Sequence, residues 1–317
     1  MHESGVSAVK TMTRQDIVKW LESKGYRFTE LTLISEGDYA VEDADWNYKD
    51  VPHIHFVHPL AEQSNFVLAE PVKCAVQLQG FLKIWLPLLN VAYETDRFRY
   101  VYVSTLFFFV IAVETHSEAL APLRTRVVTH YSIGTPRLLF FLAPFMKWAV
   151  RRNYRILMAD DIPMRERRGA LRKLGYSFAK RGQSYGFMET TKIAESHLRP
   201  PPGGQHRLTC NYQAELADGR EALIGDIGLL GFRLVRDGTD VLVFPRACPH
   251  EGASLDDRPC ESGVITCRWH GRRLPPIVKF AWAQPADFSN PPYRGSVAGN
   301  RLTIEYDDGM AASGRTR

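Results

Sequence analysis

The sequence has few cysteines and no apolar run long enough to cross a bilayer. Five cysteines scattered over 317 residues are too few for a disulfide framework and favour a reducing cytoplasm. The longest apolar runs, 106–113 and 138–150, fall short of the roughly 20 residues that a transmembrane helix needs. The first sixteen residues also lack the apolar core of a signal peptide. We therefore expect a cytoplasmic protein.

The chain also lacks a strong charge excess and any internal repeat. The formal net charge is +5, which does not argue for a nucleic-acid partner. Hydrophobic residues make up 45% and charged residues 24%, as in globular proteins. At 317 residues the chain is long enough for two domains, each with its own core.

Four residues near the C-terminus have the spacing of an iron–sulfur site. Cys248 and His250 form a C-x-H pair, Cys267 and His270 form a C-x-x-H pair, and sixteen residues separate the pairs. A Rieske [2Fe–2S] cluster needs two thiolates on one iron and two imidazoles on the other, which two such loops supply. The rival interpretation is a structural Cys₂His₂ zinc site, although that site usually uses C-x-x-C with H-x-x-x-H.

Small residues in both loops agree with a bound cluster. Gly252 follows the first pair and Gly271 follows the second. Glycine lets the backbone approach the cluster sulfides closely. We therefore expect Gly252 and Gly271 to belong to the cofactor-binding loops.

The loop sequences C-P-H-E-G-A-S-L and C-R-W-H-G resemble those of Rieske non-heme iron oxygenases, in the oxygenase component of α-subunit type. Respiratory Rieske proteins carry one further cysteine in each loop, whereas only Cys260 lies between the pairs here. The loops depart from the family at three positions. Glu251 stands where arginine is common, and Arg268 and Arg272 replace residues that are often proline and tryptophan.

A second motif lies near the N-terminus, where Asp50, His53 and His58 form D-x-x-H-x-x-x-x-H. With this composition, the pattern is expected by chance on the order of 0.02 times. Two imidazoles and one carboxylate can hold Fe(II) on one face and leave the other face open. The pattern is similar to the one with which Rieske oxygenases bind mononuclear iron, and the resemblance implies His53 and His58 as ligands.

The spacing of the two histidines leaves alternatives open. On an ideal helix, residues five apart point roughly 140° from each other, so a helix would have to bend or unwind, and Pro52 is consistent with that. On a strand, His53 and His55 would instead face the same way. The third interpretation is a polar loop without metal.

The resemblance implies a carboxylate ligand on the last long helix of the first domain. The segment M-A-D-D-I-P-M-R-E offers Asp161, with Asp160 as the alternative, and is most similar to the ketosteroid-hydroxylase and cholesterol-desaturase branch of the family. An Asp-Asp pair on a helix is otherwise typical of a solvated surface.

The pattern of the first two thirds predicts an α+β domain. A first helix is expected over 13–24, with a capping box from Thr13 to Asp16. One antiparallel sheet is expected from segments rich in β-branched and aromatic residues, namely 66–72, 74–82, 84–94, 99–114 and 124–133. A long helix beginning at Thr135–Pro136 would lie across the sheet.

This is the helix-grip arrangement, which the catalytic domain of Rieske oxygenases shares with START-like lipid carriers. After it we expect a mainly β Rieske domain, with a hairpin at Asp237–Gly238. The expected order is an N-terminal helical segment, the catalytic domain, a Pro/Gly linker, the Rieske domain and a disordered tail, over 1–30, 31–198, 199–206, 207–308 and 309–317.

A basic segment precedes the linker. It contains Glu166 among the cations Arg165, Arg167, Arg168, Arg172, Lys173, Lys180 and Arg181. Such a segment suits an acidic electron donor or peripheral contact with an anionic membrane. A solvated helix face is the simpler interpretation.

The resemblance implies an oxygenase function. The family's usual domain order is inverted here, because the Asp50 motif precedes the Cys-His pairs. A separate reductase or ferredoxin, drawing on NAD(P)H, would reduce the cluster, and Asp50 would bridge it to the mononuclear Fe(II) of another subunit. With O₂ as co-substrate, an apolar terpenoid, sterol, carotenoid or polyketide would be hydroxylated. The expected assembly is a homo-oligomer, namely a homotrimer. With the inverted domain order, the alternative is a monomer whose cluster contacts the iron site of the same chain.

Two other functions fit the same motifs. In one, a Rieske domain acts as an electron carrier or sensor and is fused to a START-like lipid-binding domain without mononuclear iron. In the other, the same iron centre desaturates or dealkylates its substrate instead of hydroxylating it.

Overall fold

The computed structural model describes residues 12–50, 53–59, 61–69, 72–81, 84–179, 197–203 and 206–307. Pro52, Lys180, Arg181 and the expected tail at 309–317 lie outside the described residues. The chain forms two compact units, and the division falls between Glu166 and Arg167.

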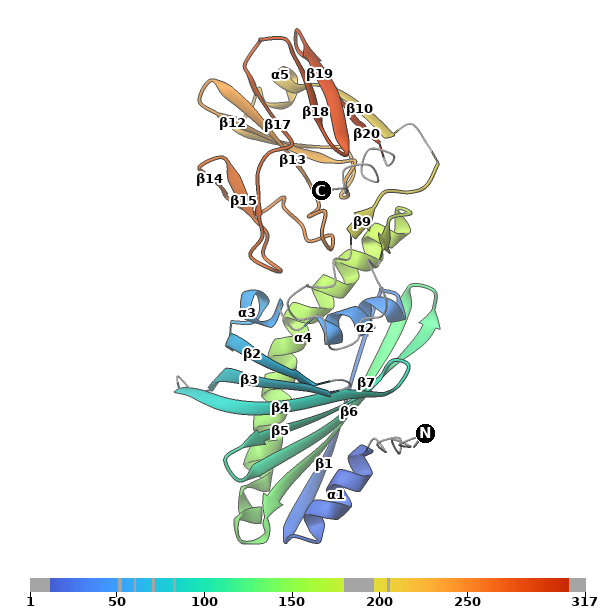
Figure 1. Cartoon of the computed structure of the whole chain (residues 1–317), viewed down its shortest axis with the longest axis vertical. Coiled ribbons are helices and arrows are strands. Elements are labelled where there is room, and N and C mark those ends of the chain that lie inside the picture. The colour runs from blue at the N-terminus through green and yellow to red at the C-terminus, as the bar shows by residue number, and fades with distance from the viewer. Residues whose placement is uncertain are drawn as a thin grey trace, which may run out of the picture. The chain divides into compact units, whose positions relative to one another are not determined.

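A seven-stranded antiparallel sheet forms the first unit (Figure 1). Its order is β1-β7-β6-β5-β4-β3-β2, so six consecutive strands form a meander and β1 pairs with the last of them. The strands are β1 (Tyr26–Gly37), β2 (Ala61–Ala69), β3 (Val72–Phe81), β4 (Ile84–Asp96), β5 (Arg99–Leu106), β6 (Phe109–Ala121) and β7 (Arg124–Pro136).

The helices of this unit are α1 (Arg14–Glu22), α2 (Val41–Lys49), α3 (His53–Val57), the 3-10 helix η1 (Arg137–Leu142) and α4 (Ala143–Lys173). The capping box is confirmed, because Thr13 accepts from the Asp16 backbone and the Asp16 side chain accepts from Thr13. Within the described part of the chain, no helix is both long and apolar enough to cross a membrane.

Helices cover both faces of the sheet. On β6, Phe109 packs with Met146 of α4, whereas Ala112 packs with Ile17 and Leu21 of α1. Because successive strand residues point to opposite faces, α1 and α4 lie on opposite sides of the sheet. The long helix across one face confirms the expected helix-grip fold (Figure 1).

Three boundaries differ from the predictions. The expected strand 99–114 is two strands, because the chain turns at Phe107, whose φ is 52°, without any glycine or proline to signal it. The strand β7 continues through Pro136, which a strand tolerates at its end, and α4 begins only after η1. The strand β1 begins at Tyr26, inside the segment expected to be helical.

The second unit is mainly β, as predicted. Its sheets have the orders β10-β20-β19-β18, β11-β12-β13-β17, β14-β15-β16 and β8-β9. The expected hairpin is confirmed: β12 pairs with β13, and Gly238 in the turn has a φ of +62°.

The elements of this unit are β8 (Ser177–Ala179), β9 (His197–Arg199), β10 (His206–Asn211), α5 (Tyr212–Glu215), β11 (Glu221–Ile224), β12 (Phe232–Asp237), β13 (Asp240–Pro245), β14 (Cys260–Glu261), β15 (Val264–Thr266), β16 (Arg273–Leu274), β17 (Val278–Ala281), β18 (Ala286–Asn290), β19 (Tyr293–Ala298) and β20 (Arg301–Tyr306).

The end of α4 belongs to the core of the second unit. Leu171 is fully buried and forms one cluster with Tyr176, Leu198, Leu229 and Ala247. Tyr176 donates to Asp226 at 2.7 Å and accepts from the Leu230 backbone at 3.0 Å. We expected this segment within the catalytic domain, and those domain limits stay a prediction.

Replacing Leu171 by alanine should lower the free energy of unfolding of the second unit by about 2–5 kcal/mol, because it leaves a cavity in this core. Leu174→Ala is the matched control, since Leu174 is 46% exposed, and it should change the free energy by less than about 1 kcal/mol. Urea unfolding followed by circular dichroism measures both. Equal effects of the two substitutions would contradict the packing described.

Candidate metal centres

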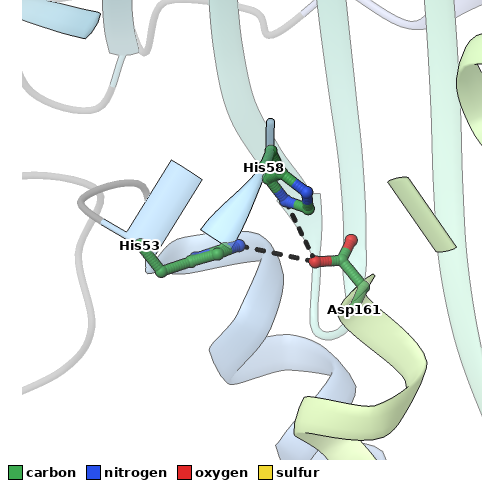
Figure 2. Close-up of side chains that lie close together, drawn as sticks. All are labelled: His53, His58 and Asp161. Atoms are coloured by element: carbon green, nitrogen blue, oxygen red, sulfur yellow. Dashed lines mark ion pairs between the residues drawn. The ribbon is translucent and has the colours of Figure 1, made fainter. Parts of the chain in front are cut away.

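The structure brings together three side chains of the first unit that the sequence singled out. His53, His58 and Asp161 are buried, and their ligand atoms lie within 4.8 Å of one another. The Nε2 atoms of His53 and His58 are 3.4 and 3.3 Å from Asp161 Oδ1 (Figure 2). The two imidazoles, 5.3 Å apart, therefore converge on one carboxylate oxygen.

His53 and His58 can face the same point although they are five residues apart, because α3 ends between them. His53 is the first residue of α3, which ends at Val57, so His58 lies just beyond the helix. The His58 N–H still bonds to the Ile54 carbonyl at 3.2 Å, but the chain after it is free to leave the helical path. The alternative partner His55 is on the same helix and is exposed, so the structure does not pair it with His53.

The outer nitrogens of both rings contact other groups of the chain. His53 Nδ1 donates to the backbone oxygen of Asp50, and His58 Nδ1 lies 3.2 Å from Asp160 Oδ2. Hydrogen bonds of this kind fix the tautomer and orientation of a ligand imidazole and leave Nε2 for the metal. Asp160 therefore lies on the outer side of His58, whereas Asp161 lies between the inner nitrogens.

Asp50, the expected bridge between centres, is also buried in this cluster. Its Oδ2 is 3.6 Å from His53 Nδ1. It thus lies beside the imidazole of a candidate ligand, where a bridging carboxylate would be needed, and its bridging role stays a prediction.

Asn47 and Arg165 complete the site, and the sequence analysis missed both in this role. Asn47 donates to Asp161 Oδ1 at 3.2 Å and accepts from Arg165 at 2.5 and 2.9 Å. Arg165 is fully buried, 3.5 Å from Asp161 Oδ2, and its guanidinium lies 4.9 Å from the Tyr48 ring centroid. The two residues hold both oxygens of the carboxylate in place.

The interpretation of the basic segment as a solvated face was therefore wrong for its first turns. Arg165 and Arg168 are buried, and Arg167 donates to the backbone oxygens of Gly252 and Ile227. Charge alone could not reveal this, because an arginine run looks the same in a sequence whether its guanidinium groups meet water or buried acceptors.

Electrostatics favour a carboxylate at this site. Burial alone would raise the pKa of Asp161, but its contacts with His53 and His58 and the charge of Arg165 hold that pKa well below its usual range. Burial alone would lower the pKa of His58, but Asp161 and Asp160 raise it above its ordinary 6.5.

These residues fit a divalent metal ion. Two donor atoms about 2.1 Å from a metal and about 90–105° apart lie roughly 3.0–3.3 Å from each other, close to the distances in this cluster. The buried Nε2 of His53 makes no hydrogen bond within the described part of the chain, which fits an atom that is available to a metal. Two imidazoles and one carboxylate match the donor set of non-heme Fe(II).

Fe(II) binding should strengthen as pH rises, by roughly tenfold per unit below the raised pKa of His58, because metal and proton compete for the imidazole. In the metal-free protein, protonated His58 stabilises the fold at low pH, and this stabilisation is lost as pH rises through the folded pKa. Asp160→Asn should move the binding profile to lower pH, measured by anaerobic Fe(II) titration.

Glu166→Gln, which changes an exposed carboxylate on the same helix, is the control and should leave the profile in place. Loss of binding at every pH in Asp160→Asn would show that Asp160 is itself the ligand.

Arg165→Lys should weaken Fe(II) binding about 10–100-fold, because lysine keeps the charge but cannot contact Asn47 and Asp161 together. The control is Arg155→Lys, at an exposed position of α4, which should bind like the wild type. Anaerobic titration with Fe(II) measures both, after circular dichroism has shown that they fold. Unchanged affinity in Arg165→Lys would mean that Asp161 needs no positioning.

In the second unit, two loops of matching backbone geometry carry the Cys-His pairs. In each loop the cysteine carbonyl accepts from the N–H of the glycine four residues on, at 2.9 Å. These glycines, Gly252 and Gly271, have φ values of +86° and +63°, which side chains rarely tolerate. A Cβ on Gly252 would lie 2.6 Å from Leu171, so close packing adds to the demand for glycine there.

The two loops bring their donor groups together. The rings of His250 and His270 are 4.8 Å apart, and both residues are buried. Cys248 and Cys267 are each 1% exposed and form no disulfide. The hydrogen bond between these thiols raises the pKa of Cys248 and lowers the pKa of Cys267 to about 6. Two adjacent thiols and two imidazoles fit the donor set of a Rieske cluster.

Glu251, noted in the sequence only as a departure from the family pattern, is buried in this cluster. Its Oε1 is 4.0 Å from His250 Nε2, and its carboxylate lies within 4.8 Å of ligand atoms of both histidines. No feature of the sequence indicated that Glu251 is buried, because a glutamate in a loop is usually exposed.

The comparison with family models agrees with this geometry. Residues 206–276 match the Rieske [2Fe-2S] domain. All four Cys and His residues lie inside the match. The second unit therefore contains a Rieske domain, which implies a [2Fe–2S] cluster.

A comparison with curated proteins found no match. Among solved structures, an aromatase/cyclase from a Streptomyces species has 13% identity and a TM-score of 0.39, with 45% of this chain and 96% of that chain covered. A START superfamily protein from Mycobacterium smegmatis has 10% identity and a TM-score of 0.38, with 43% and 97% covered. Norcoclaurine synthase from Thalictrum flavum has 11% identity and a TM-score of 0.35, with 49% and 94% covered.

Proposed function

We propose that this protein is a Rieske-type non-heme iron oxygenase with the catalytic domain before the Rieske domain. The observation that supports it most strongly is the convergence of His53, His58 and Asp161 in a chain that also contains a Rieske domain. A lipid-binding domain without iron has no need of two buried imidazoles that face one carboxylate. The donor set, two imidazoles and one carboxylate, is the one that non-heme Fe(II) oxygenases use.

The residues of the first site have separable tasks. His53, His58 and Asp161 would hold the metal on one side, and Arg165 with Asn47 would keep the carboxylate ionised and in one orientation. When bound, the cluster would supply single electrons and the Fe(II) would activate O₂.

The interior beside this site supports an apolar substrate with some hydrogen-bonding groups. Tyrosine side chains of α2, α4 and the sheet gather there. The ring centroids of Tyr48 and Tyr100 are 6.1 Å apart, and those of Tyr131 and Tyr154 are 6.3 Å apart. Burial raises the pKa of Tyr48 and raises the pKa of Tyr154 to about 12, so both phenols stay neutral. Rings with neutral hydroxyls suit a terpenoid, sterol, carotenoid or polyketide better than an ionic metabolite.

The proposal includes the partners that such an oxygenase needs. A reductase or ferredoxin would pass electrons from NAD(P)H to the Rieske cluster. Asp50, beside His53, would connect the mononuclear site to a cluster histidine of a neighbouring subunit in a homotrimer.

The decisive measurement is iron and acid-labile sulfide per chain on anaerobically purified protein. We expect about three irons and two sulfides in the wild type, because the cluster holds two irons and the mononuclear site one. His53→Ala should contain about two irons with sulfide unchanged, whereas His55→Ala, which changes an exposed histidine on the same helix, should keep all three.

Cysteine variants test the other centre in the same assay. Cys267→Ser should lose the sulfide and keep about one iron, and Cys260→Ser, at a cysteine outside the Cys-His pairs, should match the wild type. Two irons in the wild type and in His53→Ala alike, even after Fe(II) is supplied, would sink the oxygenase proposal and favour an electron carrier fused to a lipid-binding domain.

A further inference from the structure

A row of large apolar side chains is exposed where the sheet of the first unit passes into its long helix. Leu138, Phe141, Phe145 and Trp148 are 91%, 73%, 48% and 48% exposed. Leu138 and Phe141 lie on η1, and Phe145 and Trp148 lie on the first turns of α4. These four residues are called the apolar row below.

The apolar row lies along one side of the two helices. Residues three apart eclipse each other on a 3-10 helix, so Leu138 and Phe141 point the same way. On α4, positions 145, 148, 152 and 155 fall within an arc of about 80° at 100° per residue. Arg152 and Arg155 therefore continue the line of Phe145 and Trp148, and the exposure of the row shows that it faces away from the core.

A neighbouring turn adds two more exposed rings. Phe107 and Phe108, between β5 and β6, are 76% and 44% exposed. The next residue, Phe109, packs in one cluster with Met146 on the buried side of α4. The turn therefore lies beside the start of α4, at the end of the unit where the green helix begins in Figure 1.

The segment that carries the row has charge of one sign. Residues 137–159 contain no aspartate or glutamate, and their cations are Arg137, Lys147, Arg151, Arg152 and Arg155. Arginine and lysine side chains can lay their aliphatic stems on an apolar surface and extend their charges toward anionic groups. A partner for this surface must therefore accept aromatic rings and cations side by side.

We infer that the apolar row is a docking surface for an anionic lipid bilayer. Leu138, Phe141, Phe145 and Trp148 would enter the interface between headgroups and acyl chains, and the arginines would lie at the level of the phosphates. The contact is peripheral, because no helix in the part of the chain that the structure describes can span a membrane. The inference needs neither metal centre.

Charge argues against a second copy of the chain as the occupant. A two-fold axis that passed near Arg152 and Arg155 would bring these cations close to the same cations of the other copy. Like charges that face each other weaken such an interface, whereas lipid phosphates neutralise them.

The test is cosedimentation of the full-length protein with vesicles of phosphatidylcholine alone and of phosphatidylcholine mixed with phosphatidylglycerol. The wild type should bind the mixed vesicles, and high salt should weaken binding. The double variant Phe141→Ser with Trp148→Ser should bind at least about tenfold more weakly, because two rings no longer leave water. Arg152→Gln with Arg155→Gln should bind mixed vesicles about 25-fold more weakly, at roughly fivefold per charge.

Leu223→Ser is the matched control, because Leu223 is 46% exposed on β11 of the other unit, and it should bind like the wild type. Sedimentation velocity of each variant shows whether the assembly has changed. If the double variant does not fold, Leu138→Ser at the most exposed position supplies the same comparison.

Two outcomes would overturn the inference. The first is no binding of the wild type to either vesicle, and the second is a row variant that binds as well as the wild type. If the oligomer of that variant also dissociates, the row is an interface between copies of the chain.

Discussion

The carboxylate of Asp161 is buried among two imidazoles, an amide and a guanidinium, and the chemistry of the first unit depends on that balance of charge. A buried carboxylate without partners would take up a proton. Arg165 prevents this from one side, and His53 and His58 face the other. The guanidinium is itself held by Asn47 and lies over a tyrosine ring, so each charge in the site has a neighbour that compensates it.

The same helix supplies parts of both units. α4 carries Asp160 and Asp161 in the first unit, and its last turns, with Arg167 and Leu171, belong to the packing around the first cluster loop in the second. Gly252 of that loop has no room for a Cβ because Leu171 occupies the space. One continuous helix therefore contributes to the buried site around Asp161 and to the core that supports a Cys-His loop.

A feature of this protein could be predicted from the sequence when residues close together in the chain determine it. The Cys-His pairs are local, because each loop places its own cysteine and histidine through a turn closed by a glycine. The aspartate-histidine motif was local too, but its spacing did not show which histidine accompanies His53. The end of α3 at Val57 decides that it is His58 and not His55. The turn at Phe107 had no composition signal, since its residues are those of a strand.

The sequence by itself determined the Cys-His pairs and the aspartate-histidine motif, the alternation that builds the sheet and the mainly β character of the C-terminal unit, because short-range spacing and periodicity encode them. Only the tertiary structure decided that Asp161 rather than Asp160 meets both imidazoles, that Arg165 is buried instead of solvated, and that Glu251 is buried close to His270. These outcomes depend on contacts between residues up to 118 positions apart, as for Asn47 and Arg165. Burial of a charge is a property of the whole fold, and no local pattern of residues carries it.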